Sequence, residues 1–403
     1  MTAVRDVITG DASLAQELFE RARGLQPLLA RNAAKTEADR RVAEENIEAL
    51  TEAGLFKLTV PRRFGGYQIP FETKLEVSAI LAEACPSTAW VVTLINVCNW
   101  LVALYAGQVQ QEVWGENPDA RVCGVLAPTA TTRRVEGGLR VTGSWGYGSG
   151  CLHSQWAGLG IPVVNDAGEP VDQGLALIPM SELTIEDTWF VAGMKGTGSN
   201  TLVADDVFVP DHRIMSVSAA LVNEYATEFK DEALYRSAIV PVLALVLAGP
   251  QVGMARAAVR LVIEKAPKRR IAYTIFERQT DSAAFQIGVS EAAMLADTAA
   301  LHVKRAAEDI DRAAERGEKM DYLTRARVRA DTGWAATKAR EAIEAAISAN
   351  GASSFAEVNP LQRLWRDSNT AARHAVVIAL VNEEIYGKAL LGIPYEDNIS
   401  PLI

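Results

Sequence analysis

Apolar residues in the last third of the chain recur at spacings of three and four. The longest such run comprises Phe285, Val289, Ala292, Leu295, Ala299, Val303, Ala306, Ile310 and Ala313. This spacing puts the apolar side chains on one stripe of a long helix, which is typical of a helix in a bundle. Further helices are expected over residues 242–265, 320–350 and 360–391. The pattern therefore predicts a C-terminal four-helix bundle within residues 216–403.

The first 120 residues show the helical period in shorter stretches. Thr36–Asp39 has the sequence of a helix cap, and the helix that it would start continues to Ala53 and stops at Gly54. A second helix is expected from Pro70 onward. The apolar stretch Ala89–Ala106 contains three polar residues and is short for a membrane span, so a buried helix is the better interpretation. We predict an N-terminal helical domain over residues 1–120.

Residues 121–215 lose the helical period and gain glycine, since nearly half of the 29 glycines fall here. Val135–Val141 is expected to form a hairpin that turns at Gly137 and Gly138. Residues 156–164, 174–179 and 201–209 are expected to form further strands. The segment is therefore predicted to be a β-barrel or sandwich domain, which makes the whole chain an α+β protein.

Composition argues against several classes of partner. The chain has 40 Lys+Arg against 50 Asp+Glu and a net charge of −10, which disfavours nucleic acid and anionic membranes as ligands. Its four cysteines form no CxxC pair and its four histidines no i, i+4 pair, so neither a disulfide scaffold nor a metal site is expected. The first 32 residues are charged throughout, unlike a signal peptide. We expect a cytoplasmic enzyme that acts on small molecules.

Two glycine-rich segments are candidates for ligand binding. Gly193–Gly198 matches neither the GxGxxG nor the phosphate-loop pattern, and it precedes a strand, so it is either a plain turn or a turn whose amides contact a ligand. Gly143–Gly150 alternates glycine with aromatic and serine residues. Such a segment lets the backbone approach a flat ligand, with rings beside it and a hydroxyl at its heteroatoms, although a glycine-rich sheet edge would look the same.

Five segments together carry a family resemblance over nearly the full length: Gly54–Gly66, Ala84–Trp90, Gly137–Gly150, Asp187–Pro210 and Pro360–His374. In this order and spacing they resemble the acyl-CoA dehydrogenase superfamily. More narrowly, they are similar to the oxygenase components of two-component, reduced-flavin-dependent (group D) monooxygenases, such as the hydroxyphenylacetate and seco-steroid phenol hydroxylases. The resemblance implies an acyl-CoA dehydrogenase-like fold with helical, β and helical domains over residues 1–120, 121–215 and 216–403.

Two positions distinguish dehydrogenation from oxygenation. A dehydrogenase of this superfamily needs a Glu base to remove the α-proton of a thioester. One place for this base, residues 368–376, carries His374 and no Glu, and the other, around Ala248–Pro250, has no carboxylate. The resemblance therefore implies an oxygenase. In such enzymes reduced flavin (FADH2 or FMNH2) and O2 form a C4a-hydroperoxide, which oxygenates an aromatic substrate of the indole or phenol type. An N-oxygenase of an amino-sugar type substrate and an acyl-CoA dehydrogenase with a displaced base are the alternatives.

The resemblance also assigns roles to individual residues. Ser149 falls where the family places a hydroxyl at flavin N5, and His374 where a His lies near the reacting flavin carbon, so both are predicted to be catalytic. His374 is expected to hydrogen-bond the peroxide or to move its proton. The predicted cofactor-binding residues are Tyr147, Ser149, Trp189, Thr197, Gly198, Ser199, Arg270, Gln286 and Arg366, of which Arg270 and Gln286 would reach the cofactor phosphate of a neighbouring subunit. The predicted substrate-binding residues are Cys98, Trp100, His153 and His374.

Cys98 departs from the family pattern, because ring hydroxylases of this kind can carry a His there. Without that His the residue that would polarise a phenol is missing, and Cys98 with Trp100 makes a more apolar wall, suited to an indole. The chain has no nicotinamide-binding fingerprint, so a separate NAD(P)H:flavin reductase is expected to supply the reduced flavin. The resemblance further implies a homotetramer.

Overall fold

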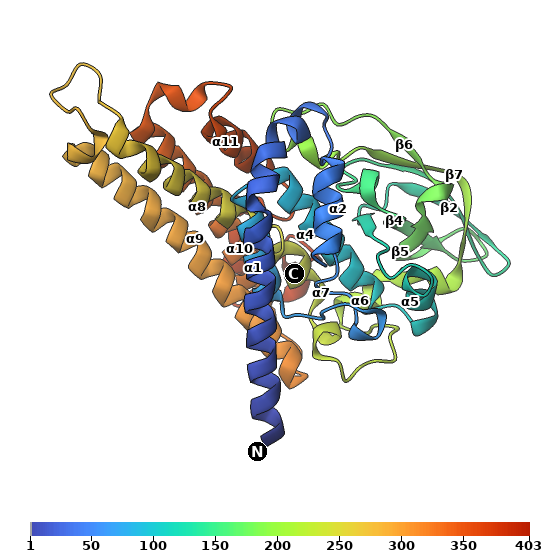
Figure 1. The fold of residues 1–403 in the computed structure, drawn as a ribbon. Helices are drawn as coiled ribbons and strands as arrows, with labels where there is room; N and C mark the ends of the chain where they lie inside the picture. Colours follow the sequence, from blue (N-terminus) through green and yellow to red (C-terminus); the bar gives the residue numbers. More distant parts are fainter. Residues whose placement is uncertain (1) are drawn as a thin grey trace.

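Helices form the N-terminal part of the chain (Figure 1). The structure is a computed structural model that describes residues 2–403, with side chains from Ala12 onward. The helices are α1 (Thr2–Ala38), α2 (Glu44–Glu52), α3 (Phe71–Ala82), α4 (Pro86–Val102) and α5 (Gly107–Trp114). Gly54 follows α2 with a φ of +73°, as the predicted helix stop requires.

Helix α4 is buried along nearly its whole length because it lies between two hydrophobic cores. Val92 and Ile95 pack into the core of the N-terminal helices. Trp90 and Cys98, on another side of α4, join the core shared with the C-terminal helices. The predicted buried helix is confirmed, and its two faces place side chains of the N-terminal part at the centre of the molecule.

Two four-stranded sheets make up the middle of the chain. The strands are β1 (Val122–Val125), β2 (Ala130–Val135), β3 (Gly138–Trp145), β4 (Trp156–Val164), β5 (Pro170–Pro179), β6 (Thr184–Glu186), β7 (Thr201–Pro210) and β8 (Ile214–Ser216). One sheet has the order β1-β4-β5-β8, with β1 parallel to β4, and the other the order β2-β3-β7-β6. Residues of both sheets share one apolar core, so the domain is a sandwich. The predicted hairpin is confirmed, since Val135 pairs with Gly138.

The remaining chain returns to helices: α6 (Val217–Leu221), α7 (Ile239–Leu245), α8 (Ala248–Lys265), α9 (Ala283–Arg316), α10 (Tyr322–Asn350), α11 (Pro360–Ala371) and α12 (Ala379–Leu390). The predicted apolar stripe is the buried face of α9, which starts at the cap Ser282 and ends at Gly317. Helix α10 lies against α8, α9 and α12. Ile239–Lys268 is apolar and long enough to cross a membrane, but 83% of its apolar window is buried inside the fold.

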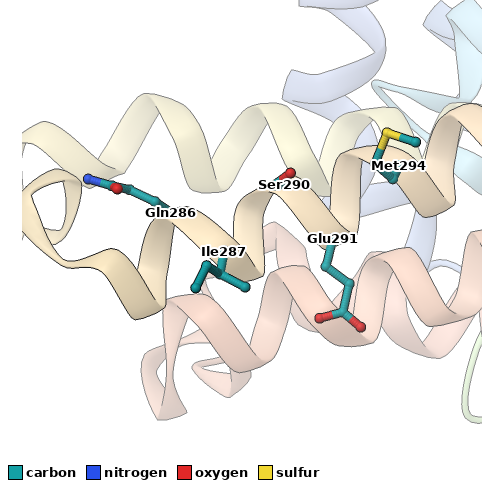
Figure 2. A pocket seen from close by; sticks show the side chains of 5 residues that line it. All are labelled: Gln286, Ile287, Ser290, Glu291 and Met294. Atoms are coloured by element: carbon teal, nitrogen blue, oxygen red, sulfur yellow. The ribbon is translucent and has the colours of Figure 1, made fainter.

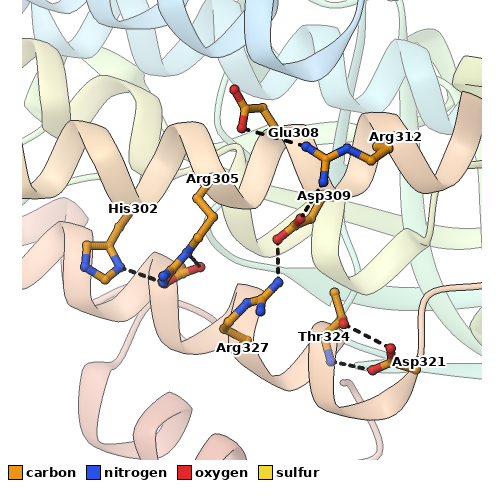
Figure 3. A network of polar contacts seen from close by, with 9 residues as sticks. His302, Arg305, Glu308, Asp309, Arg312, Asp321, Thr324 and Arg327 are labelled. Carbon is orange, nitrogen blue, oxygen red and sulfur yellow. Dashed lines mark hydrogen bonds and ion pairs between the residues drawn. The ribbon is translucent and has the colours of Figure 1, made fainter.

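Polar contacts fix how α9 and α10 lie against each other (Figure 3). Asp331 is 2% exposed and accepts hydrogen bonds from Arg305 and His302, whose Nδ1 is 2.7 Å from its Oδ1. One turn further along α9, Asp309 accepts a 2.6 Å hydrogen bond from Arg327. His302 is thus a structural residue of the helix pair, as expected for a histidine within a long helix.

Two local predictions are wrong. Thr36–Asp39 does not cap a helix, because α1 continues to Ala38; the Thr36 hydroxyl instead accepts the N–H of Ala43 at 3.2 Å, and α2 begins at Glu44. Residues 360–391 are two helices, α11 and α12, so the fourth side of the bundle is interrupted. Residues 372–378 are not helical, so His374 lies in the turn between α11 and α12 instead of on the face of a helix.

Candidate active site

A chain of hydrogen bonds joins α4 to two turns of the β domain. The indole Nε1 of Trp90 donates to Ser149 Oγ at 3.2 Å. Ser149 Oγ is 2.7 Å from Ser199 Oγ, which is 2.6 Å from Thr197 Oγ1. Thr197 Oγ1 donates to the carbonyl oxygen of Met194 at 2.9 Å. All four side chains that form these hydrogen bonds are buried.

The direction of these hydrogen bonds follows from the groups at the two ends of the network, the Trp90 indole and the Met194 carbonyl. A carbonyl only accepts and an indole N–H only donates. Because Thr197 spends its single hydrogen on Met194, it must accept from Ser199, and Ser199 must in turn accept from Ser149. Ser149 therefore receives the Trp90 hydrogen, gives its own to Ser199, and keeps one lone pair as a hydrogen-bond acceptor.

Backbone contacts bring the two turns together. The N–H of Gly148 donates to Asn200 O at 3.0 Å, and the N–H of Gly150 to Thr197 O at 3.4 Å. Gly150 has a φ of +80°, and a Cβ on Gly148 would lie 2.9 Å from Asn200 O. The glycine-rich sequence is thus needed for close approach of two backbones, and Gly193–Gly198 is the second of the two turns.

Two aromatic rings stand beside this junction. Tyr147 has a φ of +66° and a side chain that is 73% exposed. Its ring meets that of Trp189 edge-on, with 5.7 Å between the centroids. Trp189 is held by its indole N–H, which donates to Met194 O at 3.0 Å. An exposed aromatic ring next to a buried hydroxyl chain suits a flat heteroaromatic ligand.

His374 approaches the same place from the break between α11 and α12. Its ring centroid is 6.1 Å from that of Trp90. The surrounding protein lowers the pKa of His374 to about 4 by desolvation, although the side chain keeps an accessible surface. The side chain is therefore largely surrounded by protein atoms while part of it still faces solvent. The N–H of Val376 donates to Nδ1 at 3.4 Å, so the neutral ring carries its hydrogen on Nε2.

Arg366 and its neighbour Asp367 anchor the second turn to α11. Arg366 donates to Ala192 O at 2.6 Å and pairs with Glu37 of α1 at 2.5 Å. Asp367 accepts the N–H of Met194 at 2.5 Å, and burial raises the pKa of its carboxyl to about 6. The guanidinium predicted to bind cofactor is therefore occupied in positioning the turn.

The other predicted residues take no part in this chain of hydrogen bonds. His153 is close to Glu44 of α2, and its carbonyl accepts from Arg121 at 2.6 Å. Trp100 donates to Leu234 O at 2.9 Å inside the core. Cys98 is buried two turns along α4 from Trp90. Arg270 and Gln286 are exposed around the loop between α8 and α9, at the end of these helices farthest from the sheets (Figure 1).

Sequence reasoning assigned no role to Trp90, although this residue closes the Ala84–Trp90 segment. It contacts both predicted catalytic residues, Ser149 and His374. Among the residues that the structure describes, His, Cys, Asp and Glu side chains form no group of three suited to a metal ion. The functional groups at this candidate site are therefore hydroxyls, aromatic rings and one neutral imidazole.

Comparison with known proteins gives the family. Residues 17–117 match the acyl-CoA dehydrogenase N-terminal domain, and residues 245–378 match the acyl-CoA dehydrogenase C-terminal domain. The flavin-dependent monooxygenase oxygenase subunit HsaA of Rhodococcus jostii (strain RHA1) is 35% identical over 94% of this chain and 100% of its own length. The chain belongs to this family of flavin-dependent monooxygenase oxygenase components.

Two further relatives agree with this membership. The oxygenase component of an FADH(2)-dependent resorcinol hydroxylase from Rhizobium sp. (strain MTP-10005) is 32% identical over 93% of this oxygenase and 94% of its own chain. XiaF from Streptomyces sp., in a structure with FADH2 and glycerol, superimposes with a TM-score of 0.92 at 38% identity, over 98% of this chain and 99% of XiaF. The resemblance inferred from the sequence is confirmed.

Proposed function

We propose that this oxygenase uses reduced flavin and O2 to hydroxylate an aromatic substrate of the indole or phenol type. The observation that carries the proposal is the lone pair left on Ser149, whose donor Trp90 also contacts His374. Reduced flavin carries a hydrogen on N5 and needs an acceptor there, whereas oxidised flavin needs a donor. When bound, reduced flavin supplies the electrons that activate O2, so that one oxygen atom enters the substrate and the other leaves as water.

The residues present fit this cofactor. Ser149 offers its free lone pair to N5–H, because its own hydrogen is already committed to Ser199. Tyr147 and Trp189 would flank the ring system, and the turn Thr197–Ser199 would lie along its edge. Arg366 and Asp367 hold this turn in place and act as positioning residues.

His374 would donate a hydrogen bond to the oxygen that reacts when reduced flavin is bound. Its lowered pKa keeps the imidazole neutral at physiological pH, and the Val376 N–H at Nδ1 leaves Nε2–H free to donate. Of the two roles expected from the sequence, these features favour a fixed hydrogen bond over a proton shuttle. Hydrogen bonds of this kind stabilise developing charge without reorganisation at the moment of reaction.

A separate NAD(P)H:flavin reductase in the cytoplasm would supply the reduced flavin, as either FADH2 or FMNH2. The test is a product screen in which the purified chain, a generic flavin reductase and NADH are offered indoles and phenols. Hydroxylated product that requires both proteins supports the proposal. Oxidation of NADH with all the consumed O2 reduced to H2O2, and no hydroxylated product from any ring offered, would overturn it.

We also propose a homotetramer, built through the outer face of α9. Ile287, Met294 and Leu301 recur every seven residues there and are 68%, 64% and 67% exposed. Figure 2 shows the start of this face, where Gln286, Ile287, Ser290, Glu291 and Met294 line an open hollow of about 500 Å³. Packing of a second copy against this face would cover the apolar stripe and bring Arg270 and Gln286 towards the cofactor of a neighbour.

A further inference from the structure

Lys74 is fully buried in the middle of the protein. It lies on α3, which runs antiparallel to α4. The two helices are aligned by the hydrogen bond from Thr93 Oγ1 to Ser78 Oγ (2.8 Å) and by the edge-on contact of Phe71 with Trp100 (5.5 Å between centroids). Lys74 is one turn from each of these contacts, so it faces the turn of α4 that carries Cys98.

The Nζ of Lys74 has no hydrogen-bond partner and enters no ion pair among the residues that the structure describes, although Lys74 is 0% exposed. The buried amide side chains of α4, by contrast, have hydrogen-bond partners. Asn96 donates to Leu55 O at 2.8 Å, and Asn99 donates to Phe56 O at 2.9 Å. Burying an ammonium without a partner costs several kcal/mol, about as much as many domains have in total. A partner that binds there would remove this cost.

The place of Lys74 relative to the cofactor site suits a substrate. Cys98, the predicted wall of the substrate site, is eight residues beyond Trp90, which is about 12 Å along the helix axis. A substituted aromatic ring of about that length, with one end at the flavin, would place its far substituent near Lys74. Burial lowers the pKa of Lys74 to about 7, and Cys98 is the one titratable group that interacts with it noticeably. Both the ammonium and the free amine are therefore available near neutral pH.

We propose that Lys74 binds an acidic oxygen of the aromatic substrate, a phenolate or a carboxylate, beside Cys98. This inference rests on the proposed function and names the substrate class of the same site. Cys98 itself supplies no positive charge, so the charge beside it comes from Lys74 on α3.

The test compares acidic probes with their O-methylated partners, which cannot ionise: indole-3-acetate with its methyl ester, and 2-naphthol with 2-methoxynaphthalene. Their dissociation constants are measured under anaerobic conditions with the full chain and reduced flavin, without turnover. For the wild-type chain we expect at least one acidic probe to bind at least about tenfold more tightly than its methylated partner, which is about 1.4 kcal/mol. Equal binding within both pairs would overturn the proposal even if no variant folds.

Lys74→Met keeps the length of the side chain and removes its charge. We expect this variant to bind acidic and methylated probes equally and to unfold at a higher temperature, because an unpartnered amine is gone from the interior. Lys338→Met, which removes a partly buried lysine that already pairs with Glu341, should leave the preference unchanged. A preference that survives in Lys74→Met would contradict the proposal. Because binding is measured without O2, failure to hydroxylate any ring would count against the proposed function alone.

Discussion

The indole N–H of Trp90 and the hydroxyl of Ser149 meet at 3.2 Å, across the junction of α4 and the β domain. This contact orients the hydroxyl. With Trp90 donating to it, Ser149 has one hydrogen to give and one lone pair left, and Ser199 takes the hydrogen. Ser199 thus makes Ser149 an acceptor by taking its hydrogen, and Trp90, which reaches the site from a different part of the chain, leaves it a single lone pair.

Ser149→Ala should uncouple oxygen activation from hydroxylation, so that H2O2 replaces product while flavin oxidation continues. It also leaves the Trp90 N–H buried without an acceptor, which costs about 1–3 kcal/mol of the free energy of unfolding. Product and H2O2 measured per flavin oxidised, together with urea unfolding, check both effects. Full coupling in Ser149→Ala would show that the hydroxyl has another role.

Thr197→Val should weaken the preference for reduced over oxidised flavin. Without the Thr197 hydroxyl, Ser199 loses its acceptor and can turn its hydrogen towards Ser149, which then becomes free to donate. The ratio of the two dissociation constants should shift by roughly tenfold, as expected for about 1.4 kcal/mol. Thr188→Val is the control, since it removes an exposed hydroxyl that pairs with Thr201 at 2.8 Å. An unchanged ratio in Thr197→Val would contradict the proposed direction of the hydrogen bonds that run from Ser149 to Met194.

His374→Ala should lower the ratio of product to H2O2 by roughly ten- to hundredfold, the value of one hydrogen bond of about 1.5–3 kcal/mol to a charged group. His374→Asn, which keeps an N–H donor, should retain part of the coupling. Because the pKa of His374 lies near 4, coupling in the wild type should be flat from about pH 6 to 8. A break in this profile near pH 6.5 that disappears in His374→Asn would identify a proton shuttle instead.

The lowered pKa of His374 also makes the stability of the folded state depend on pH. The folded state resists protonation of His374 down to about pH 4, while the unfolded chain takes up this proton near its ordinary pKa of 6.5. The folded state therefore loses stability as the pH falls from 6.5 towards 4, and this loss should be smaller in His374→Asn.

Ile287→Glu should break the assembly, because it places a charge in the centre of the apolar stripe on α9. Size-exclusion chromatography with light scattering should show a smaller species than the wild type. Val171→Glu is the matched control, since Val171 is 60% exposed on β5, outside the bundle. A wild-type monomer, or an Ile287→Glu variant of unchanged mass, would contradict the proposed interface.

Local pattern was enough for much of the fold. The predicted strand over residues 156–164 has the bounds of β4, and the apolar stripe from Phe285 onward is the buried face of α9. The alternation of apolar and polar residues in a strand, and their spacing in a helix, are local properties of the sequence, so both elements could be predicted from it. The break at residues 372–378 was missed, because it depends on contacts from outside the segment, such as the donation of Asn382 Nδ2 to Val376 O at 3.0 Å.

The site was predicted in part, and for a similar reason. Ser149, Thr197 and Ser199 were identified through the family resemblance, and the structure brings their hydroxyls together. Trp90 and Lys74 were not identified, because an indole donor and an unpartnered amine look like ordinary helix residues in sequence. The roles of Trp90 and Lys74 depend on which groups lie next to them, and those neighbours are set by packing between distant segments.

A single turnover under ¹⁸O2 tests the central claim most directly. The purified chain would be mixed with chemically reduced flavin and a panel of indoles and phenols, with no reductase present, and the products weighed by mass spectrometry. The account predicts a hydroxylated ring that carries one ¹⁸O atom, from at least one member of the panel. Hydroxylated product whose oxygen comes from water, or no oxygenated product with every reducing equivalent recovered as H2O2, would contradict it.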